Sequence, residues 1–165
     1  MSSTEHQAMH PDAGRAAVGS ALRPASAMPP RPAEGGGGRA WALGFLAYIP
    51  IPFLGQLLGG VIMAGAGASQ RKRAGLVGAQ GRHAANWGMT YALLTVLCVV
   101  GAVTLGLLTN VLPAQQEALS ASALTVLGVW LFGVNLAHVV ICIIGLVRAG
   151  QLREFRCPIA IPFFR

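Results

Sequence analysis

Three long stretches of this chain contain no charged residue, and they constrain the fold more than any other feature. They run from 40 to 70, from 84 to 116 and from 118 to 147. A helix that crosses the hydrocarbon core of a bilayer needs ~20 mainly apolar residues, so each stretch has room for one crossing but not for two complete ones. The pattern predicts an all-α integral membrane bundle of three transmembrane helices. The expected spans are about 41–68, 84–112 and 122–147.

The composition excludes a soluble domain, because only 10% of the residues are charged, against about a quarter in soluble proteins. The basic residues gather in two places, Arg71, Lys72, Arg73 and Arg82 in the first link and Arg148, Arg153, Arg156 and Arg165 after the third stretch. The second link carries only Glu117. By the positive-inside rule the first link and the C-terminus are cytoplasmic. The net charge of +7 accompanies no nucleic-acid motif, so we expect the lipid bilayer, and no nucleic acid, as a partner.

The chain divides into a tail and a membrane domain. Residues 1–39 are rich in Ala, Pro and Gly without apolar periodicity, which predicts a disordered N-terminal tail. Residues 40–165 form the expected helical membrane domain, ending in an apolar tail over 150–165 that lies on the bilayer surface or against the bundle. Cys98, Cys142 and Cys157 have neither metal-site nor disulfide spacing, so we expect no cofactor or metal.

The first uncharged stretch is broken by two prolines. Pro50 and Pro52 remove two backbone donors, which rules out a straight helix. Two interpretations remain, a kinked helix that crosses the bilayer and a re-entrant pair of short helices that leaves on the side where it entered. We favour the crossing helix, which places the N-terminus outside. In either case the break from Tyr48 to Phe53 should face protein, because irregular backbone at membrane depth needs partners.

The other two stretches read as long helices joined in an antiparallel hairpin by the link at Pro113. Trp41, Trp87, Tyr91 and Trp130 lie near the ends of their stretches, as interfacial aromatic residues do. The third helix carries a stripe of small and polar residues at helical spacing, which predicts an inward packing face. The stripe consists of Gly128, Asn135, His138, Cys142, Gly145 and Ala149.

Asn135 and His138 are the candidates for chemistry at membrane depth, where polar residues are costly. A proton relay needs a chain of partners, and the uncharged stretches supply no Asp or Glu. The simpler role for His138 is a hydrogen bond to a backbone carbonyl. No catalytic constellation is present, and the sequence predicts a protein without enzymatic activity.

Two further groups of residues are candidate structural or functional positions. Arg82, His83 and Asn86 enter the second helix at the expected headgroup level, where Asn86 can bond either the broken backbone near Pro50 or the chain near Pro158. Arg156 and Pro158 belong to the C-terminal motif.

These stretches resemble a known family. Gln80-Gly-Arg-His-Ala-Ala-Asn-Trp87, Phe155-Arg-Cys-Pro-Ile159 and the segment from Ile49 to Gly60 are similar to motifs of the bacterial membrane proteins called domain of unknown function 4870, which are related to Tic-twenty-like proteins. The resemblance covers about 41–163. It implies a compact bundle of about three helices in the bacterial cytoplasmic membrane, and a protein-import-like role by analogy only.

Two functions fit the sequence. The first is a non-enzymatic scaffold or helper that acts through membrane protein partners or as a homo-oligomer. The alternative is a small oligomeric channel or transporter subunit, suggested by the broken first stretch and by Asn135 and His138.

Overall fold

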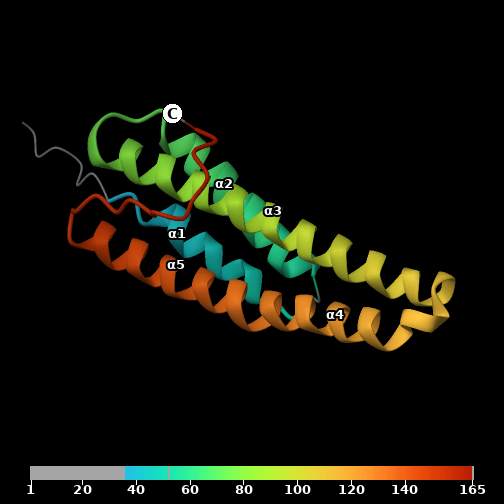
Figure 1. The fold of residues 1–165 in the computed structure, drawn as a ribbon. Coiled ribbons are helices and arrows are strands. Elements are labelled where there is room, and N and C mark those ends of the chain that lie inside the picture. The colour runs from blue at the N-terminus through green and yellow to red at the C-terminus, as the bar shows by residue number, and fades with distance from the viewer. Residues whose placement is uncertain (1–35, 52, 165) are drawn as a thin grey trace, which may run out of the picture. The chain divides into compact units, whose positions relative to one another are not determined.

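The computed structural model describes residues 36–51 and 53–164, and these are helical without any strand (Figure 1). The described residues form one compact unit. The elements are α1 (Arg39–Leu43), η1 (Gly44–Tyr48), α2 (Leu54–Gln70), α3 (Gly75–Val111), η2 (Pro113–Gln115), α4 (Gln116–Gly128), η3 (Val129–Val134, a π-helical turn) and α5 (Asn135–Gly150). The predicted all-α class is confirmed for this part of the chain. The disordered-tail prediction for 1–39 lies mostly outside the described residues, although Gly36 already packs against Ala149.

Two helical stretches are long and apolar enough to cross a membrane. They are α3, Gly75–Val111, and the continuous run Pro113–Gly150. At 1.5 Å per residue each is about 55 Å long, which exceeds a hydrocarbon core of about 30 Å. They run antiparallel, since Trp87 meets His138 and Thr95 meets Trp130. The predicted hairpin at Pro113 is therefore confirmed, with helices longer than the expected spans 84–112 and 122–147.

The segment 39–70 folds back on itself and does not form one kinked helix. The part before the prolines packs against α2. Gly59 contacts Ala47, and Gly44 contacts Met63 closer to the two ends of the segment. A cavity of about 550 Å³ is lined by both Arg39 and Gln70, so the two ends of the segment lie at the same end of the bundle. Our preference for a single crossing helix over 41–68 is not supported, and three crossings are not confirmed.

Glycine explains why this hairpin forms. A Cβ on Gly59 would collide with the Ala47 backbone, and one on Gly55 would lie 2.5 Å from the Ile49 carbonyl oxygen. The G-x-x-x-G pair at 55 and 59 thus allows α2 to approach η1 within the same chain. At the turn, Phe53 adopts a positive φ of 61°, a conformation that reverses the chain at some cost for a non-glycine residue.

The bundle has two unlike ends. The basic end carries residues 71–73, Arg82 and the segment 148–156, whereas the far end is the turn at Pro113. Near the basic end, α1, η1 and α2 pack beside α3 and α5. In the far half, which we define as Val96–Val111 with η2 and α4, the described helices pair only with each other, and no residue of α4 is buried.

Candidate functional site

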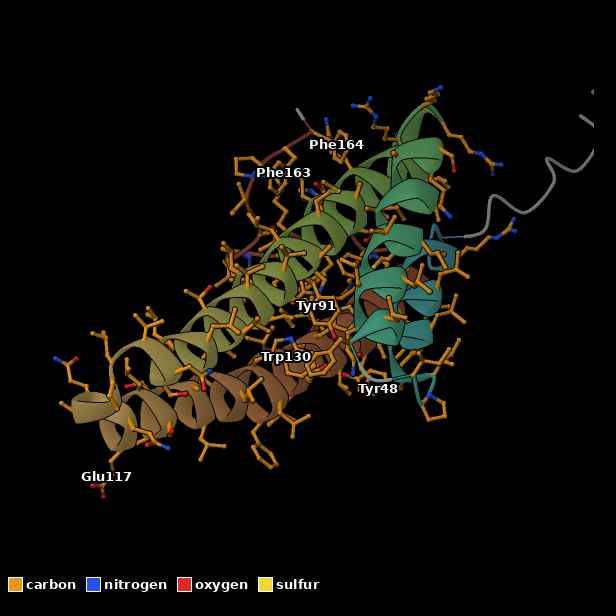
Figure 2. The ribbon with its side chains drawn as sticks, turned by 90° about the vertical axis from the view of Figure 1, so that its right-hand side faces the viewer. Tyr48, Tyr91, Glu117, Trp130, Phe163 and Phe164 are labelled. Atoms are coloured by element: carbon orange, nitrogen blue, oxygen red, sulfur yellow. The ribbon has the colours of Figure 1, made fainter. Side chains whose placement is uncertain are left out.

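A cluster of bonded polar and aromatic side chains fills the middle of the bundle. We call Tyr48, Trp87, Tyr91, Asn135 and His138 the core polar cluster. They come from η1, α3 and α5, and Figure 2 shows Tyr48, Tyr91 and the neighbouring Trp130 where these elements meet. The ring of Tyr91 stacks on that of His138 with centroids 3.8 Å apart. Except for Tyr48, every member is buried.

The hydrogen bonds of His138 identify its proton state. Trp87 Nε1 donates to His138 Nδ1 over 3.1 Å. Because an indole N–H is only a donor, Nδ1 must be an acceptor, and the imidazole is neutral with its proton on Nε2. That nitrogen lies 3.0 Å from the Gly44 carbonyl oxygen, to which it donates. The bond is to a backbone carbonyl, and both ring nitrogens already have partners.

Asn135 connects three elements through both its side chain and its backbone. Its Oδ1 accepts a 2.7 Å hydrogen bond from the Tyr91 hydroxyl, and its Nδ2 donates to the Trp130 carbonyl oxygen over 2.9 Å. The Tyr48 hydroxyl donates to the Asn135 backbone oxygen at 2.8 Å. Asn135 directly follows the π-helical turn Val129–Val134. Its side chain therefore bonds a carbonyl within the widened turn.

The aromatic residues are core residues, which corrects the prediction that they anchor the membrane interface. Trp41, Trp87, Tyr91 and Trp130 are each at most 4% exposed. Their polar atoms find partners inside the protein, as with the Trp41 Nε1 bond to Gln80 Oε1 at 3.0 Å. A position near the end of an uncharged stretch does not distinguish an interfacial aromatic residue from a core residue. Here these residues belong to the core, because they pack where the short helices meet α3 and α5.

The predicted stripe on the third helix faces inward over most of its length. Asn135, His138, Cys142, Gly145 and Ala149 are buried, whereas Gly128 has open space around it. A Cβ on Gly145 would collide with the Trp41 ring, so this glycine makes room for the indole.

Catalytic chemistry has little support in the core polar cluster. Cys142 Sγ lies 3.5 Å from His138 Nε2, the geometry of a thiol beside a base. Both side chains, however, are fully buried, and Nε2 already donates to Gly44. Among the described residues, no group of three or more His, Cys, Asp or Glu side chains could hold a metal ion.

Asn86 fastens the C-terminal tail to α3. Its Oδ1 accepts from the Phe164 N–H at 2.7 Å, and its Nδ2 donates to the Phe164 carbonyl oxygen at 3.2 Å. One turn on, Thr90 Oγ1 accepts from the Ile161 N–H at 2.9 Å. Asn86 thus bonds the returning tail and not the chain near Pro50. These bonds satisfy tail backbone groups that would otherwise be unpaired against an apolar surface.

The other candidate positions of the C-terminal motif lie outside the core. Glu154 Oε1 lies 3.0 Å from His83 Nε2 and accepts from Arg156 Nε at 3.1 Å. The hydrogen bond from Arg156, followed by that from His83, lowers the pKa of Glu154 below its usual value. Pro158 is exposed in the tail and has no role that the contacts explain.

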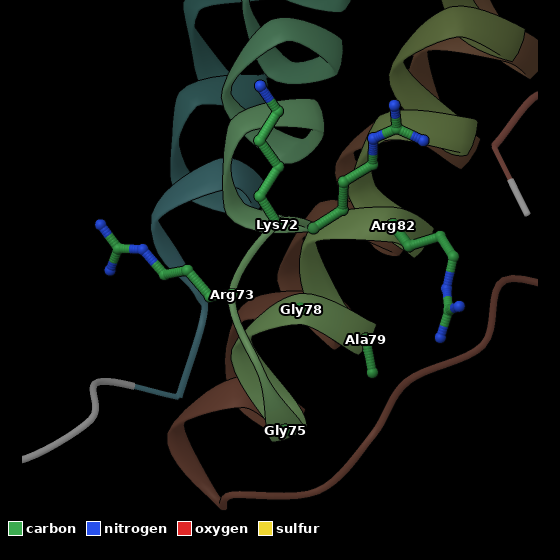
Figure 3. Close-up of a pocket in the computed structure, with 7 residues that line it drawn as sticks. Lys72, Arg73, Gly75, Gly78, Ala79 and Arg82 are labelled. Carbon is green, nitrogen blue, oxygen red and sulfur yellow. The ribbon is translucent and has the colours of Figure 1, made fainter.

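The proline break and the basic link occupy opposite sides of the fold. Pro50 is exposed at the tip of the 39–70 hairpin, whereas Pro52 lies outside the described residues. At the tip, the Phe53 ring stacks on Trp130 at 5.1 Å, so the break faces protein only in part. Arg82 is exposed and lines a cavity at the basic end together with the first link (Figure 3).

The sequence assigned no role to Gln80, although it opens the motif at 80–87, or to Thr90. Gln80 is fully buried, accepts from Trp41 and donates to the Arg153 carbonyl oxygen at 2.6 Å. A signal was present, since Gln80, Ala84 and Trp87 recur at helical spacing on one face of α3, but only the long-range partners reveal what that face binds.

Comparison with known proteins identifies a family. The model of the magnetosome magnetite crystal formation protein family matches residues 39–164, which is more than three quarters of the chain. No curated protein and no solved structure matches. The family match overturns the resemblance to domain of unknown function 4870 and the Tic-twenty-like proteins. The motifs behind that resemblance all fall within the matched residues. The motif at 80–87 joins α3 to α1 and to the tail, and the motif from Ile49 to Gly60 lies in the 39–70 hairpin. Such short packing motifs do not distinguish one small membrane bundle from another.

Proposed function

From the premise that this chain belongs to the magnetosome magnetite crystal formation protein family, we propose that it is a non-enzymatic membrane protein that supports magnetite crystal formation by organising other proteins in the magnetosome membrane. The observation that carries the proposal is the match over 39–164, which includes every described helix.

The chemistry of the described residues favours an organising role over catalysis. The members of the core polar cluster bond to one another, and all of them except Tyr48 are buried. The two described carboxylates lie at opposite ends, Glu154 at the basic end and Glu117 near the far end, so they form no acid–base pair. A neutral His138 with both nitrogens bonded is also a poor proton carrier. The channel alternative and the protein-import role are therefore left without support by the family match and by this chemistry.

The far half supplies a surface through which such a protein can act. Val103, Leu107 and Val111 on α3 and Leu124 on α4 are each more than half exposed. Helix faces in a membrane associate when close packing is available, and Gly101, Gly106 and Gly128 have open space around them. We propose that partner helices, or a second copy of the chain, pack here.

Complementation in a magnetite-forming bacterium that lacks the chain tests this function. Wild type should restore crystal number and size by electron microscopy. Val103→Trp with Leu107→Trp, which adds bulk to the far half, should restore them poorly at equal protein level. The matched control, Leu58→Trp with Val61→Trp on the exposed face of α2, should restore them fully. Normal crystals in the bacterium that lacks the chain would contradict the proposed function. Equal effects of the two double variants would show that the far half is not the surface on which partners pack.

A further inference from the structure

The first link builds a cationic surface around the start of α3. Arg71, Lys72, Arg73 and Arg82 line a cavity of about 380 Å³ together with Gly75, Gly78 and Ala79. Glycine lets the link wrap closely, because a Cβ on Gly78 would collide with the Arg73 carbonyl oxygen, and Gly75 has a positive φ of 69°. Three consecutive cations are thereby held against one helix end.

No described carboxylate neutralises these cations. The ion pairs among the described residues join Glu154 to His83 and to Arg156, and Glu117 is far along the bundle. The first turn of α3 adds partial positive charge, since its N-cap, Ala74, makes no side-chain bond to the free N–H groups. The positive charge of this surface is therefore not balanced by the described residues, and the surface should attract anions.

The arrangement of the side chains indicates a plane of anions. Figure 3 shows Lys72, Arg73 and Arg82 fanning out from the start of α3 in different directions. A pocket for one phosphate would require their tips to converge. Cations that spread across a surface instead meet several headgroups of a membrane leaflet.

The C-terminal tail supplies an apolar part of the same surface. Arg71 lies over the Phe164 ring, 4.8 Å from its centroid, so the tail and the link are in contact. Ile159, Ile161 and Phe163 are 60%, 44% and 44% exposed. The Ile161 backbone is bonded to Thr90, two turns or about 12 Å along α3 from Arg82. Apolar side chains thus lie below a layer of cations, the order in which acyl chains lie below headgroup phosphates.

We propose that the first link and the docked tail form a binding surface for anionic phospholipids, with the link cations on the headgroup phosphates and the tail side chains on the acyl chains. This surface lies at the basic end and is independent of partner packing in the far half.

Native mass spectrometry of the full chain in mild detergent tests the proposal with phosphatidylglycerol and phosphatidylcholine as probes. Wild type should retain phosphatidylglycerol about tenfold better than phosphatidylcholine. Arg71→Gln with Lys72→Gln and Arg73→Gln should lose that preference, since each cation near an anionic surface contributes several-fold to binding. The matched control, Arg148→Gln with Arg153→Gln and Arg156→Gln, removes the same charge at the same end and should keep it.

Each alternative outcome is decisive. Equal loss in both triple variants would show general charge attraction, and no preference in wild type would show that anionic headgroups are not selected. Either result would overturn the surface. Displacement of phosphatidylglycerol by millimolar inorganic phosphate would indicate a free-phosphate site and overturn the assignment to lipid. Ile159→Ser with Ile161→Ser should reduce retention of both lipids several-fold, and unchanged retention would remove the tail. Circular dichroism should give the same helix content for all variants, because every substituted side chain is exposed.

Discussion

At the scale of single residues, His138 shows how a polar group is retained inside a membrane bundle. Its neutral ring accepts from Trp87 and donates to Gly44, so it joins α3, α5 and η1 without leaving an unpaired atom. The cost of a buried polar group is incurred mainly when a partner is missing. His138 therefore stabilises the meeting point of the three elements.

Replacement of His138 by alanine should destabilise the protein strongly. It leaves the Trp87 N–H and the Gly44 carbonyl unpaired and opens a cavity, which together cost about 2–4 kcal/mol. Thermal unfolding in detergent, followed by circular dichroism, measures the loss. His83→Ala, which removes only the contact with Glu154, should cost no more than about 1 kcal/mol. Similar losses for the two variants would contradict this account of the core.

Glycine substitutions in α2 separate packing from helix propensity. At Gly59 an added methyl group meets the Ala47 backbone, so Gly59→Ala should cost about 1–3 kcal/mol through overpacking. At Gly65 nothing lies within 4 Å, and Gly65→Ala should stabilise by about 0.5–1 kcal/mol. Unfolding temperatures that change in the same direction would show that the 39–70 hairpin is not packed as described.

At the scale of elements, the sequence predicted the two long helices but not the 39–70 hairpin. The uncharged stretches 84–116 and 118–147 located α3 and the run from α4 to α5, because long apolar stretches indicate helices that cross a bilayer. The same signal cannot tell a crossing helix from a re-entrant pair, since both are apolar throughout. Gly55 and Gly59 decide between them, but their partners Ala47 and Ile49 lie across a turn that depends on the backbone of Phe53.

The candidate site was predictable residue by residue but not as a network. Asn135 and His138 are conspicuous because they are polar within an apolar helix. Their partners Tyr48 and Trp87 belong to other elements, and the sequence gives no register between elements. Asn86 likewise had two open partners, and only the path of the tail decides that it bonds Phe164.

The hydrogen bonds between Asn86 and Phe164, which hold the tail on α3, predict that the reactivity of Cys157 depends on Asn86. Burial raises the pKa of this thiol, so less thiolate is present at a given pH than for a free cysteine. Asn86→Leu should release the tail, return the pKa toward its ordinary value and increase maleimide labelling about tenfold near neutral pH, in a background lacking Cys98 and Cys142. Asn110→Leu, on the same helix but bonded only to Leu107, is the control. Equal labelling of both would mean that Asn86 does not hold the tail.

At the scale of the whole molecule, the fold changes the expected topology. Both ends of the 39–70 hairpin lie at the basic end, beside the start of α3 and the end of α5. We now predict that Gly36 lies on the same side of the membrane as the C-terminal tail, in place of the outside N-terminus first expected.

Thiol accessibility distinguishes the two topologies. In a background lacking Cys98, Cys142 and Cys157, Ser3→Cys should react with an impermeant maleimide under the same conditions as Gln151→Cys at the basic end. Ala114→Cys at the far end should show the opposite accessibility in intact, oriented membranes. If Ser3→Cys behaves like Ala114→Cys, the first segment crosses and the re-entrant hairpin is wrong.

A re-entrant arrangement of the 39–70 hairpin also predicts that the protein occupies unequal volumes in the two leaflets. Several helical elements lie at the basic end, but of the described helices only α3 and α4 continue into the far half. A protein that is wider at the basic end than at the far end fits best where the leaflet around the wider end is expanded. That leaflet is the outer leaflet of a strongly curved vesicle. Reconstituted protein should therefore reach a higher density in small liposomes than in large ones of the same lipid, with its basic end outward. Equal densities would mean that the bilayer absorbs the mismatch without bending.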